Sequence, residues 1–205
     1  MKQKLFAFVA MLLAMLQFTS CAQTHHRKEK DMKTRKTLVA FFSRAGENYA
    51  VGHIEKGNTH VIAEMIAEET GGELFRIKPS KPYPDNYTEC TKVARRELDA
   101  KARPAIHGDA EVEDYDVIFI GYPNWWGDMP MPVYTFIEKH DWQGKTVIPF
   151  CTHEGSGLST TEEKLKNACK GAIVLKGLAV RGATAHGNQN QAGQSVKNWL
   201  SKLEY

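Results

Sequence analysis

The stretch that decides the fold is Val117-Ile118-Phe119-Ile120-Gly121-Tyr122-Pro123-Asn124-Trp125-Trp126-Gly127-Asp128-Met129-Pro130. Its apolar start shows no alternation with polar residues, which is typical of a strand covered on both faces. Because successive side chains of an extended segment point to opposite sides, the two adjacent tryptophans cannot both enter one core. We therefore expect at least one indole ring to offer a flat surface to a partner. The alternative is a pair of aromatic residues packed at the rim of the protein.

Strand and helix patterns alternate along the chain on both sides of this stretch. Apolar runs predict strands at residues 37–42, 73–78, 116–121, 145–151 and 172–180. Helical spacing predicts helices from Asn58 to Gly71, around 87–98, from Pro130 or Pro132 to near Gly144, after a capping box of Ser159 and Glu162, and around 196–203. A loop is expected over 103–114. The alternation predicts an α/β fold, with a doubly wound parallel sheet and helices on both faces.

Three unusual loops follow the first, third and fourth predicted strands. In a parallel sheet of this kind, ligands bind beyond the carboxyl ends of the strands, where the strand order reverses. All three loops are expected at that edge. Their convergence is more specific than any one of them alone.

The first loop has the groups that bind a phosphate at a helix N-terminus. Ser43-Arg44-Ala45-Gly46 and Gly57-Asn58-Thr59 supply hydroxyls and backbone N–H groups. The insertion Glu47–Lys56 separates these halves, so an alternative register would use residues 43–48 alone. In the split interpretation Asn58 and Thr59 serve as both helix cap and ligand. Ordinary capping of a strand-to-helix turn explains the same residues.

The loop after the fourth strand contains two glycines that allow close backbone approach to a ring. Its residues are Thr152, His153, Glu154, Gly155, Ser156 and Gly157. His153 and Glu154, at its centre, are candidates for proton exchange with a bound molecule. A plain turn with solvated side chains is equally compatible with this loop.

In combination, these motifs resemble the flavodoxins, and within them a group with Tyr-Pro-x-x-Tyr before the second helix and Trp-Trp-Gly after the third strand. The matching segments are Ser43 with Gly57-Asn58-Thr59, Lys81–Tyr87, Pro123 with Trp125-Trp126-Gly127, and Pro149–Thr152 with Gly155-Ser156-Gly157. The resemblance covers about residues 36–203. It implies a flavodoxin-like sheet of five strands in the order 2-1-3-4-5.

The resemblance also implies one noncovalently bound FMN. The implied phosphate ligands are Ser43, Arg44, Ala45, Asn58 and Thr59. The residues implied to pack on the isoalloxazine are Pro123, Asn124, Trp125, Trp126 and Gly127, with Trp126 the expected stacking ring and Trp125 the alternative. Residues Thr152 to Gly157 would approach the pyrimidine edge. The sequence departs from the family pattern in two places. The insertion interrupts the compact phosphate turn. The loop after the fourth strand has no aromatic residue, which suggests a ring face open to substrate or covered by the insertion.

The N-terminal segment predicts export and lipid anchoring. Lys2 and Lys4 precede an apolar run that suits a secretory signal, and Phe18-Thr19-Ser20-Cys21 resembles a bacterial lipobox. We expect a lipoprotein signal peptide over residues 1–21 with lipidation at Cys21, a flexible tether over 22–35, and the FMN-binding domain over 36–205. The protein would be held outside the cytoplasm at the bacterial cell envelope. A cleaved signal with an incidental cysteine and a retained anchor helix are the alternatives.

Charge and cysteine content narrow the function classes. Residues 36–205 carry twenty Lys and Arg against twenty-two Asp and Glu, so nothing favours nucleic acid as a partner. Cys90, Cys151 and Cys169 have no metal-binding spacing and predict neither a metal site nor a disulfide framework. His107, His140 and His186 are expected to be solvated.

The leading functional hypothesis is a redox protein that transfers electrons through FMN to an unidentified protein or small-molecule partner. One alternative is an FMN-dependent NAD(P)H reductase of quinone, azo or nitro compounds. A second is a binding lipoprotein that kept the fold without the cofactor. A response-regulator receiver is disfavoured, because the first strand ends Phe41-Phe42-Ser43 without the acidic residues it needs.

Overall fold

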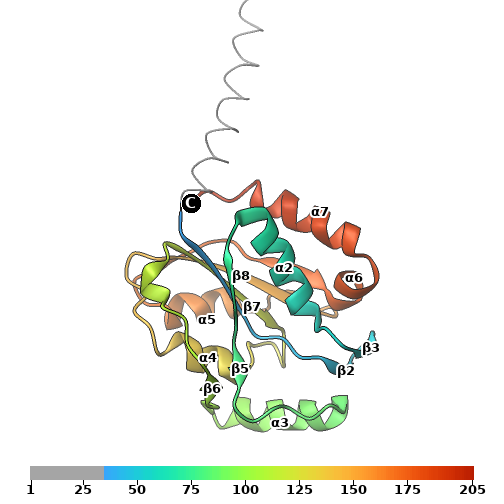
Figure 1. The fold of residues 1–205 in the computed structure, drawn as a ribbon. Coiled ribbons are helices and arrows are strands. Elements are labelled where there is room, and N and C mark those ends of the chain that lie inside the picture. Colours follow the sequence, from blue (N-terminus) through green and yellow to red (C-terminus); the bar gives the residue numbers. More distant parts are fainter. Residues whose placement is uncertain (1–34) are drawn as a thin grey trace, which may run out of the picture. The chain divides into compact units, whose positions relative to one another are not determined.

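Strand β7 (Val117–Pro123) runs through the middle of a parallel sheet in the computed structural model, which describes residues 35–205. The predicted signal peptide, Cys21 and residues 22–34 of the predicted tether lie outside the described residues. From one edge to the other, the sheet contains β10 (Leu178–Arg181), β8 (Thr146–His153), β7, β1 (Thr37–Phe41) and β4 (Glu73–Arg76) (Figure 1). The predicted order 2-1-3-4-5 is confirmed.

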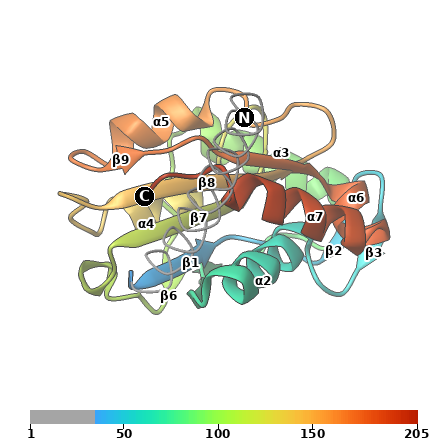
Figure 2. The ribbon, with the colours of Figure 1, turned by 90° about the horizontal axis from the view of Figure 1, so that it is seen from above.

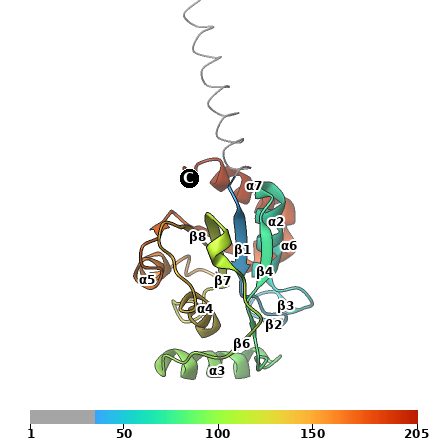
Figure 3. The same cartoon turned by 60° about the vertical axis from the view of Figure 1, so that its left-hand side comes forward.

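Helices cover both faces of the sheet because its strands are apolar on both sides. On one face, α4 (Met131–Ile137) and α5 (Thr161–Ala168) pack against the even-numbered side chains of β7. On the other, α2 (Asn58–Thr70) and α7 (Gln189–Leu200) pack against its odd-numbered side chains. Figures 2 and 3 show these two layers, with α3 (Tyr87–Asp99) lying across the carboxyl edge. Each face therefore has its own core.

The insertion after β1 folds into a hairpin at the carboxyl edge of the sheet. It consists of β2 (Gly46–Asn48) and β3 (Gly52–Ile54), paired antiparallel around a turn in which Ala50 has a φ of 67°. The Glu47 carboxylate accepts hydrogen bonds from the Asn86 side chain at 2.8 Å and from the Tyr87 N–H at 2.9 Å. The hairpin is thus fastened to the start of α3.

Several predicted boundaries are wrong, for local reasons. The loop expected over 103–114 contains β6 (Ile106–His107), which pairs with β5 (Lys78–Pro79), and a 3-10 turn, η1 (Val112–Asp114). The fifth strand is divided into β9 (Ile173–Val174) and β10. A short helix, α6 (Gly182–Gly187), follows β10 and was not predicted.

The capping box predicted from Ser159 and Glu162 is absent. Helix α5 begins after Thr160, which makes no side-chain cap hydrogen bond. The Ser159 hydroxyl instead donates to the Ser156 carbonyl, while the Glu162 carboxylate accepts from the Gly177 N–H at 2.8 Å. Tertiary partners therefore take both side chains away from the helix end.

No helix among residues 35–205 combines the length and apolarity needed to cross a membrane. Cys90, Cys151 and Cys169 are all buried free thiols.

The backbone approaches itself closely at the turn between β1 and α2. A Cβ atom on Gly57 would lie 2.3 Å from both the Arg44 carbonyl oxygen and the Ser43 hydroxyl oxygen. The two halves of the split turn therefore touch, and only glycine fits where they meet. In contrast, a Cβ atom on Gly193, within α7, would meet no atom within 4 Å.

These two glycines predict opposite effects of the same substitution. Gly57→Ala is expected to lower the free energy of unfolding by about 1–3 kcal/mol, because the backbone has to move apart. Gly193→Ala is expected to raise it by about 0.5–1 kcal/mol, since alanine is the better helix former. Urea unfolding followed by circular dichroism measures both. Equal effects of the two substitutions would contradict the close approach at Gly57.

Candidate functional site

The two halves of the first loop form one polar wall beside the start of α2. The Ser43 hydroxyl accepts a hydrogen bond from the His60 N–H at 3.1 Å. Gly57 occupies the cap position, so Asn58 and Thr59 are the first helical residues and the expectation that they cap the helix is wrong. Their own N–H groups lie at the helix N-terminus, where no carbonyl of the preceding turn is available to them. The wall therefore presents N–H groups together with the Ser43 hydroxyl.

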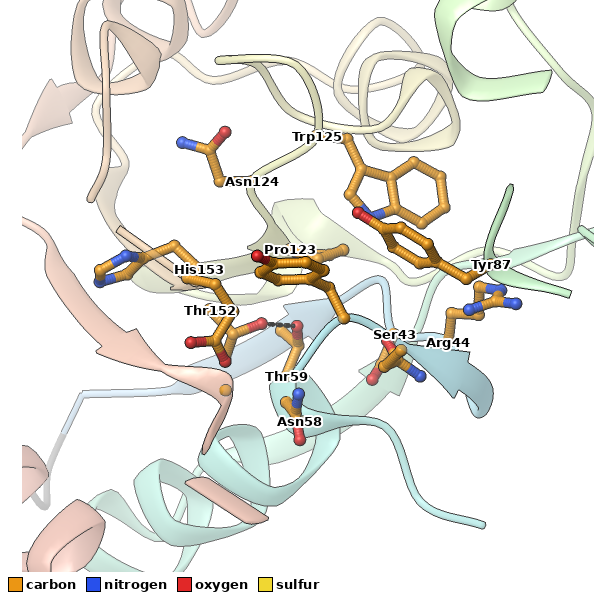
Figure 4. Close-up of a pocket in the computed structure, with 14 residues that line it drawn as sticks. Ser43, Arg44, Asn58, Thr59, Tyr87, Pro123, Asn124, Trp125, Thr152 and His153 are labelled. Carbon is orange, nitrogen blue, oxygen red and sulfur yellow. Dashed lines mark hydrogen bonds between the residues drawn. The ribbon is translucent and has the colours of Figure 1, made fainter. Parts of the chain in front are cut away.

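Thr59 and Asn58 extend this wall towards the end of β8. The Thr59 side chain is only 1% exposed, and its hydroxyl shares a 2.7 Å hydrogen bond with the Thr152 hydroxyl (Figure 4). The Asn58 side-chain oxygen is buried and has no hydrogen-bond partner among the described residues. A buried unpaired oxygen is costly unless a ligand or water satisfies it. This atom is therefore a place where a polar ligand group or a water can bind.

Arg44 fastens loops together beside this wall. Its Nε and one Nη donate to the Pro84 carbonyl at 3.1 and 2.7 Å, and the guanidinium also contacts the carbonyls of Glu47 and Asp85. The side chain joins the hairpin to the segment before α3 while adding positive charge to the site. Ala45 is half-buried.

The tryptophan loop is a tight turn closed by two backbone hydrogen bonds between Trp125 and Asp128, at 2.9 and 3.1 Å. Its central residues Trp126 and Gly127 have φ values of 58° and 76°, as a type I′ turn requires. A positive φ at tryptophan is a strained conformation that the surrounding contacts have to maintain.

Asn124 fixes this turn against the loop that leaves β8. Its side-chain oxygen accepts from the Gly127 N–H at 3.0 Å, and its amide nitrogen donates to the Gly157 carbonyl at 2.8 Å and the Ser159 hydroxyl at 2.9 Å. Its side chain is thereby engaged in joining the two loops.

The two tryptophans lie in different surroundings. Trp125 is half-buried between the edges of Phe42 and Tyr83, with ring centroids 5.3 and 5.0 Å apart. Trp126 is 55% exposed and donates from its indole nitrogen to the Thr91 carbonyl of α3 at 3.2 Å. Trp125 faces the polar wall (Figure 4), so the structure favours Trp125 over Trp126 as the ring nearest that wall.

Strand β8 extends to His153, two residues into the predicted loop, and its end together with Glu154 contributes to the same place. His153 accepts a hydrogen bond from the Gly155 N–H at 2.8 Å on Nδ1. Burial lowers the pKa of His153, outweighing the opposite effect of Glu154, so the ring is held neutral. The Glu154 carboxylate accepts from the Ala183 N–H at 2.7 Å, and its second oxygen lies 3.6 Å from the Arg181 guanidinium.

These elements enclose two adjoining hollows. The inner hollow, of about 140 Å³, is lined by Ser43, Arg44, Asn48, Tyr49, Asn58, Thr59, Tyr87, Pro123, Asn124, Trp125, Thr152, His153, Glu154 and Gly182. The outer hollow, of about 370 Å³, lies between the tryptophan turn and α3. Arg44, Asn48, Tyr87, Asn124 and Trp125 line both hollows.

Ten of the predicted site residues therefore line the inner hollow, and six do not: Ala45, Trp126, Gly127, Gly155, Ser156 and Gly157. Trp126 lines the outer hollow, while Gly127 and Gly157 hold the loops through Asn124. Gly155 and Ser156 are exposed.

The predicted site residues do not include Tyr49, Tyr87 and Gly182, and Asn48 belongs only to the alternative register, although all four line the inner hollow. Tyr49 comes from the hairpin, and its ring contacts Tyr87 with centroids 5.9 Å apart. Tyr87 closes the Tyr-Pro-x-x-Tyr motif, which was the available signal. A Cβ atom on Gly182 would lie 2.4 Å from the Asn58 amide nitrogen, a closeness that no local pattern reveals.

The expectation of a solvated His140 is wrong. Its side chain is 6% exposed, with Nε2 2.9 Å from Asp109 and Nδ1 3.6 Å from Glu113. The ring packs on Phe136 and lines neither hollow. Within residues 35–205 there is no cluster of His, Cys, Asp or Glu suited to a metal ion.

Comparisons with known proteins agree with this architecture. A flavodoxin family model matches residues 36–203. A candidate flavoprotein from Bacteroides eggerthii is 32% identical, with a TM-score of 0.62, covering 81% of this chain and 96% of the other. One from Bacteroides uniformis is also 32% identical, with a TM-score of 0.63 and coverage of 82% and 99%.

A flavoprotein from Lactobacillus acidophilus, described in complex with FMN, has the same fold at 24% identity and a TM-score of 0.56, covering 73% of this chain and 95% of the other. No curated protein matches the chain. With the family model spanning the whole sheet and its helices, the chain belongs to the flavodoxin family.

Proposed function

We propose that the protein binds one FMN noncovalently and transfers electrons through it. The observation that carries this proposal is the inner hollow, where the Ser43 to Thr59 wall, Trp125 and the start of the β8 exit loop meet. Bound FMN supplies one- and two-electron redox chemistry, while the protein binds and orients it.

The polar wall suits the phosphate and the ribityl chain. The N–H groups of Asn58 and Thr59 and the partial positive charge of the α2 N-terminus favour an anion. The unpaired Asn58 oxygen would accept from a ribityl hydroxyl. The nearby Arg44 guanidinium adds positive charge without leaving its carbonyl partners.

The opposite side of the inner hollow suits the ring system. Pro123 and Trp125 offer apolar surface, and Thr152, His153 and Glu154 offer polar groups for the pyrimidine edge. Tyr49, supplied by the hairpin, lines the same hollow and stands where the β8 exit loop has no aromatic residue. The hairpin would therefore cover part of a ring face that the sequence left open.

We further propose that Cys21 is lipidated and that the protein is held at the bacterial cell envelope through this anchor. The support is the apolar leader followed by Phe18-Thr19-Ser20-Cys21.

The central experiment is a titration with FMN and riboflavin, followed by quenching of flavin fluorescence. We expect the wild-type protein to quench FMN and to shift its visible spectrum. Absence of quenching at micromolar protein would favour a binding lipoprotein without the cofactor.

Ser43→Ala is expected to weaken FMN binding by about 1.5–3 kcal/mol, because a hydroxyl donor to a charged group is lost. The affinity for riboflavin should fall less. Equal losses of FMN and riboflavin affinity would show that Ser43 does not bind the phosphate.

The different positions of the two tryptophans predict unequal effects of their replacement on FMN affinity. Trp125→Ala is expected to weaken FMN tenfold or more, about 1.4 kcal/mol, because an aromatic surface is lost from the inner hollow. Trp126→Ala is expected to change the affinity by about twofold or less, since its ring lines only the outer hollow. The same titration measures both variants. A larger loss of FMN affinity in Trp126→Ala than in Trp125→Ala would show that Trp126 packs on the flavin ring.

Lipid anchoring predicts that Cys21 is essential for membrane attachment. In a bacterial host, the full chain is expected to incorporate radiolabelled palmitate and to sediment with membranes. Cys21→Ser should do neither, because the sulfur to which the lipid would be attached is missing. Soluble, unlabelled wild-type protein would contradict the anchor.

A further inference from the structure

The outer hollow shares five lining residues with the inner one and differs from it in Cys90, Thr91, Ala94 and Trp126. Its lining residues include Tyr87, Cys90, Thr91, Ala94, Trp125 and Trp126. The polar-wall residues Ser43, Asn58 and Thr59 do not line it, and neither do Thr152 and His153 at the end of β8 or Glu154 after it. At about 370 Å³ it falls within the range of about 300–1,000 Å³ typical of small-molecule sites.

Most polar groups on this wall already have partners. The Thr91 hydroxyl donates to the Thr88 carbonyl at 2.8 Å, and the Thr91 carbonyl accepts from the Trp126 indole at 3.2 Å. The Asn124 amide is engaged with the turn and the β8 exit loop, and the Asn48 amide donates to the Gly46 carbonyl at 2.9 Å. A ligand in the outer hollow therefore meets few unsatisfied donors.

Apart from the Arg44 guanidinium, the remaining surface of the outer hollow is aromatic or apolar. Burial raises the pKa of the Cys90 thiol, so it stays neutral and behaves as a small apolar group. The Arg44 cation is engaged with backbone carbonyls. Tyr87 lines the hollow, and burial raises the pKa of its phenol, so the hydroxyl stays protonated and can donate a hydrogen bond. One such donor suits a ligand carbonyl oxygen.

Trp126 provides an independent observation. Its positive φ of 58° and its 55% exposure place a large apolar ring at the rim of the hollow in a strained conformation. Such outliers persist where surrounding contacts enforce them, and they gather at ligand sites. The indole hydrogen bond to Thr91 and the Arg95 guanidinium, 5.6 Å from the ring, hold this position.

We propose that the outer hollow binds a planar, largely apolar aromatic compound of the quinone class, next to the cofactor site. This inference rests on the proposed function, because it assigns the inner hollow to FMN. It identifies the chemical class of the small-molecule partner. Trp125 and Tyr87, which line both hollows, form the shared wall between the two ligands.

The test is equilibrium dialysis of menadione, a two-ring quinone, with the oxidised FMN-loaded protein and with the protein before loading. The wild type is expected to bind menadione in both forms. Thr91→Phe fills the hollow from α3 and should weaken menadione binding at least tenfold. The FMN affinity should stay within twofold of the wild-type value. Thr88→Phe is the matched control, since Thr88 is exposed on the same helix and does not line the hollow.

A second variant tests the outer hollow independently if Thr91→Phe does not fold. Trp126→Ala removes the exposed ring and should also weaken menadione with little change in FMN affinity. Undetectable menadione binding by the folded wild type would overturn the proposal, as would unchanged binding in both variants. A parallel loss of FMN in Thr91→Phe would show that the hollow holds the flavin ring instead. Failure of the wild type to bind FMN, with menadione still bound, would count against the proposed function alone.

Discussion

The parallel pairing of β7 with both β1 and β8 is the constraint on which the site depends. The register places Phe41 opposite Gly121, and Pro123 opposite Thr152. All three strands consequently end at the same edge, where their exit loops have to share a small space. The covered faces tolerate no slip, since a shift by one residue would move every buried side chain to the other core. The sheet thus fixes which loops meet.

Side chains then lock the loops to one another. Ser43 reaches across the insertion to the third residue of α2, and Asn124 joins the tryptophan turn to Gly157 and Ser159. Arg44 and Glu47 tie the hairpin to the start of α3. These contacts link segments far apart in sequence, and they leave the inner hollow with a polar side and an aromatic side. That division suits a ligand with an anionic tail and a flat ring.

The hairpin and α3 cover part of the mouth of the hollows. Tyr49 and Tyr87 bring aromatic surface to the mouth of the hollows from elements outside the central sheet. In the proposed function, the outer hollow would place a small planar partner beside the cofactor. The same cover would limit the approach of water to a bound ring.

The sequence by itself determined where the five main strands of the central sheet lie, their order through the family resemblance, and the three loops at the carboxyl edge. Apolar runs and helical spacing are local signals that survive without knowledge of the partners. Only the tertiary structure decided that Trp125 lines the inner hollow, that Ser43 rather than Asn58 or Thr59 satisfies the start of α2, and that Ser159 leaves its predicted cap. The reason is physical: a side chain with two possible hydrogen-bond partners takes the one that folding brings within reach, and those partners lie up to dozens of residues away in the chain.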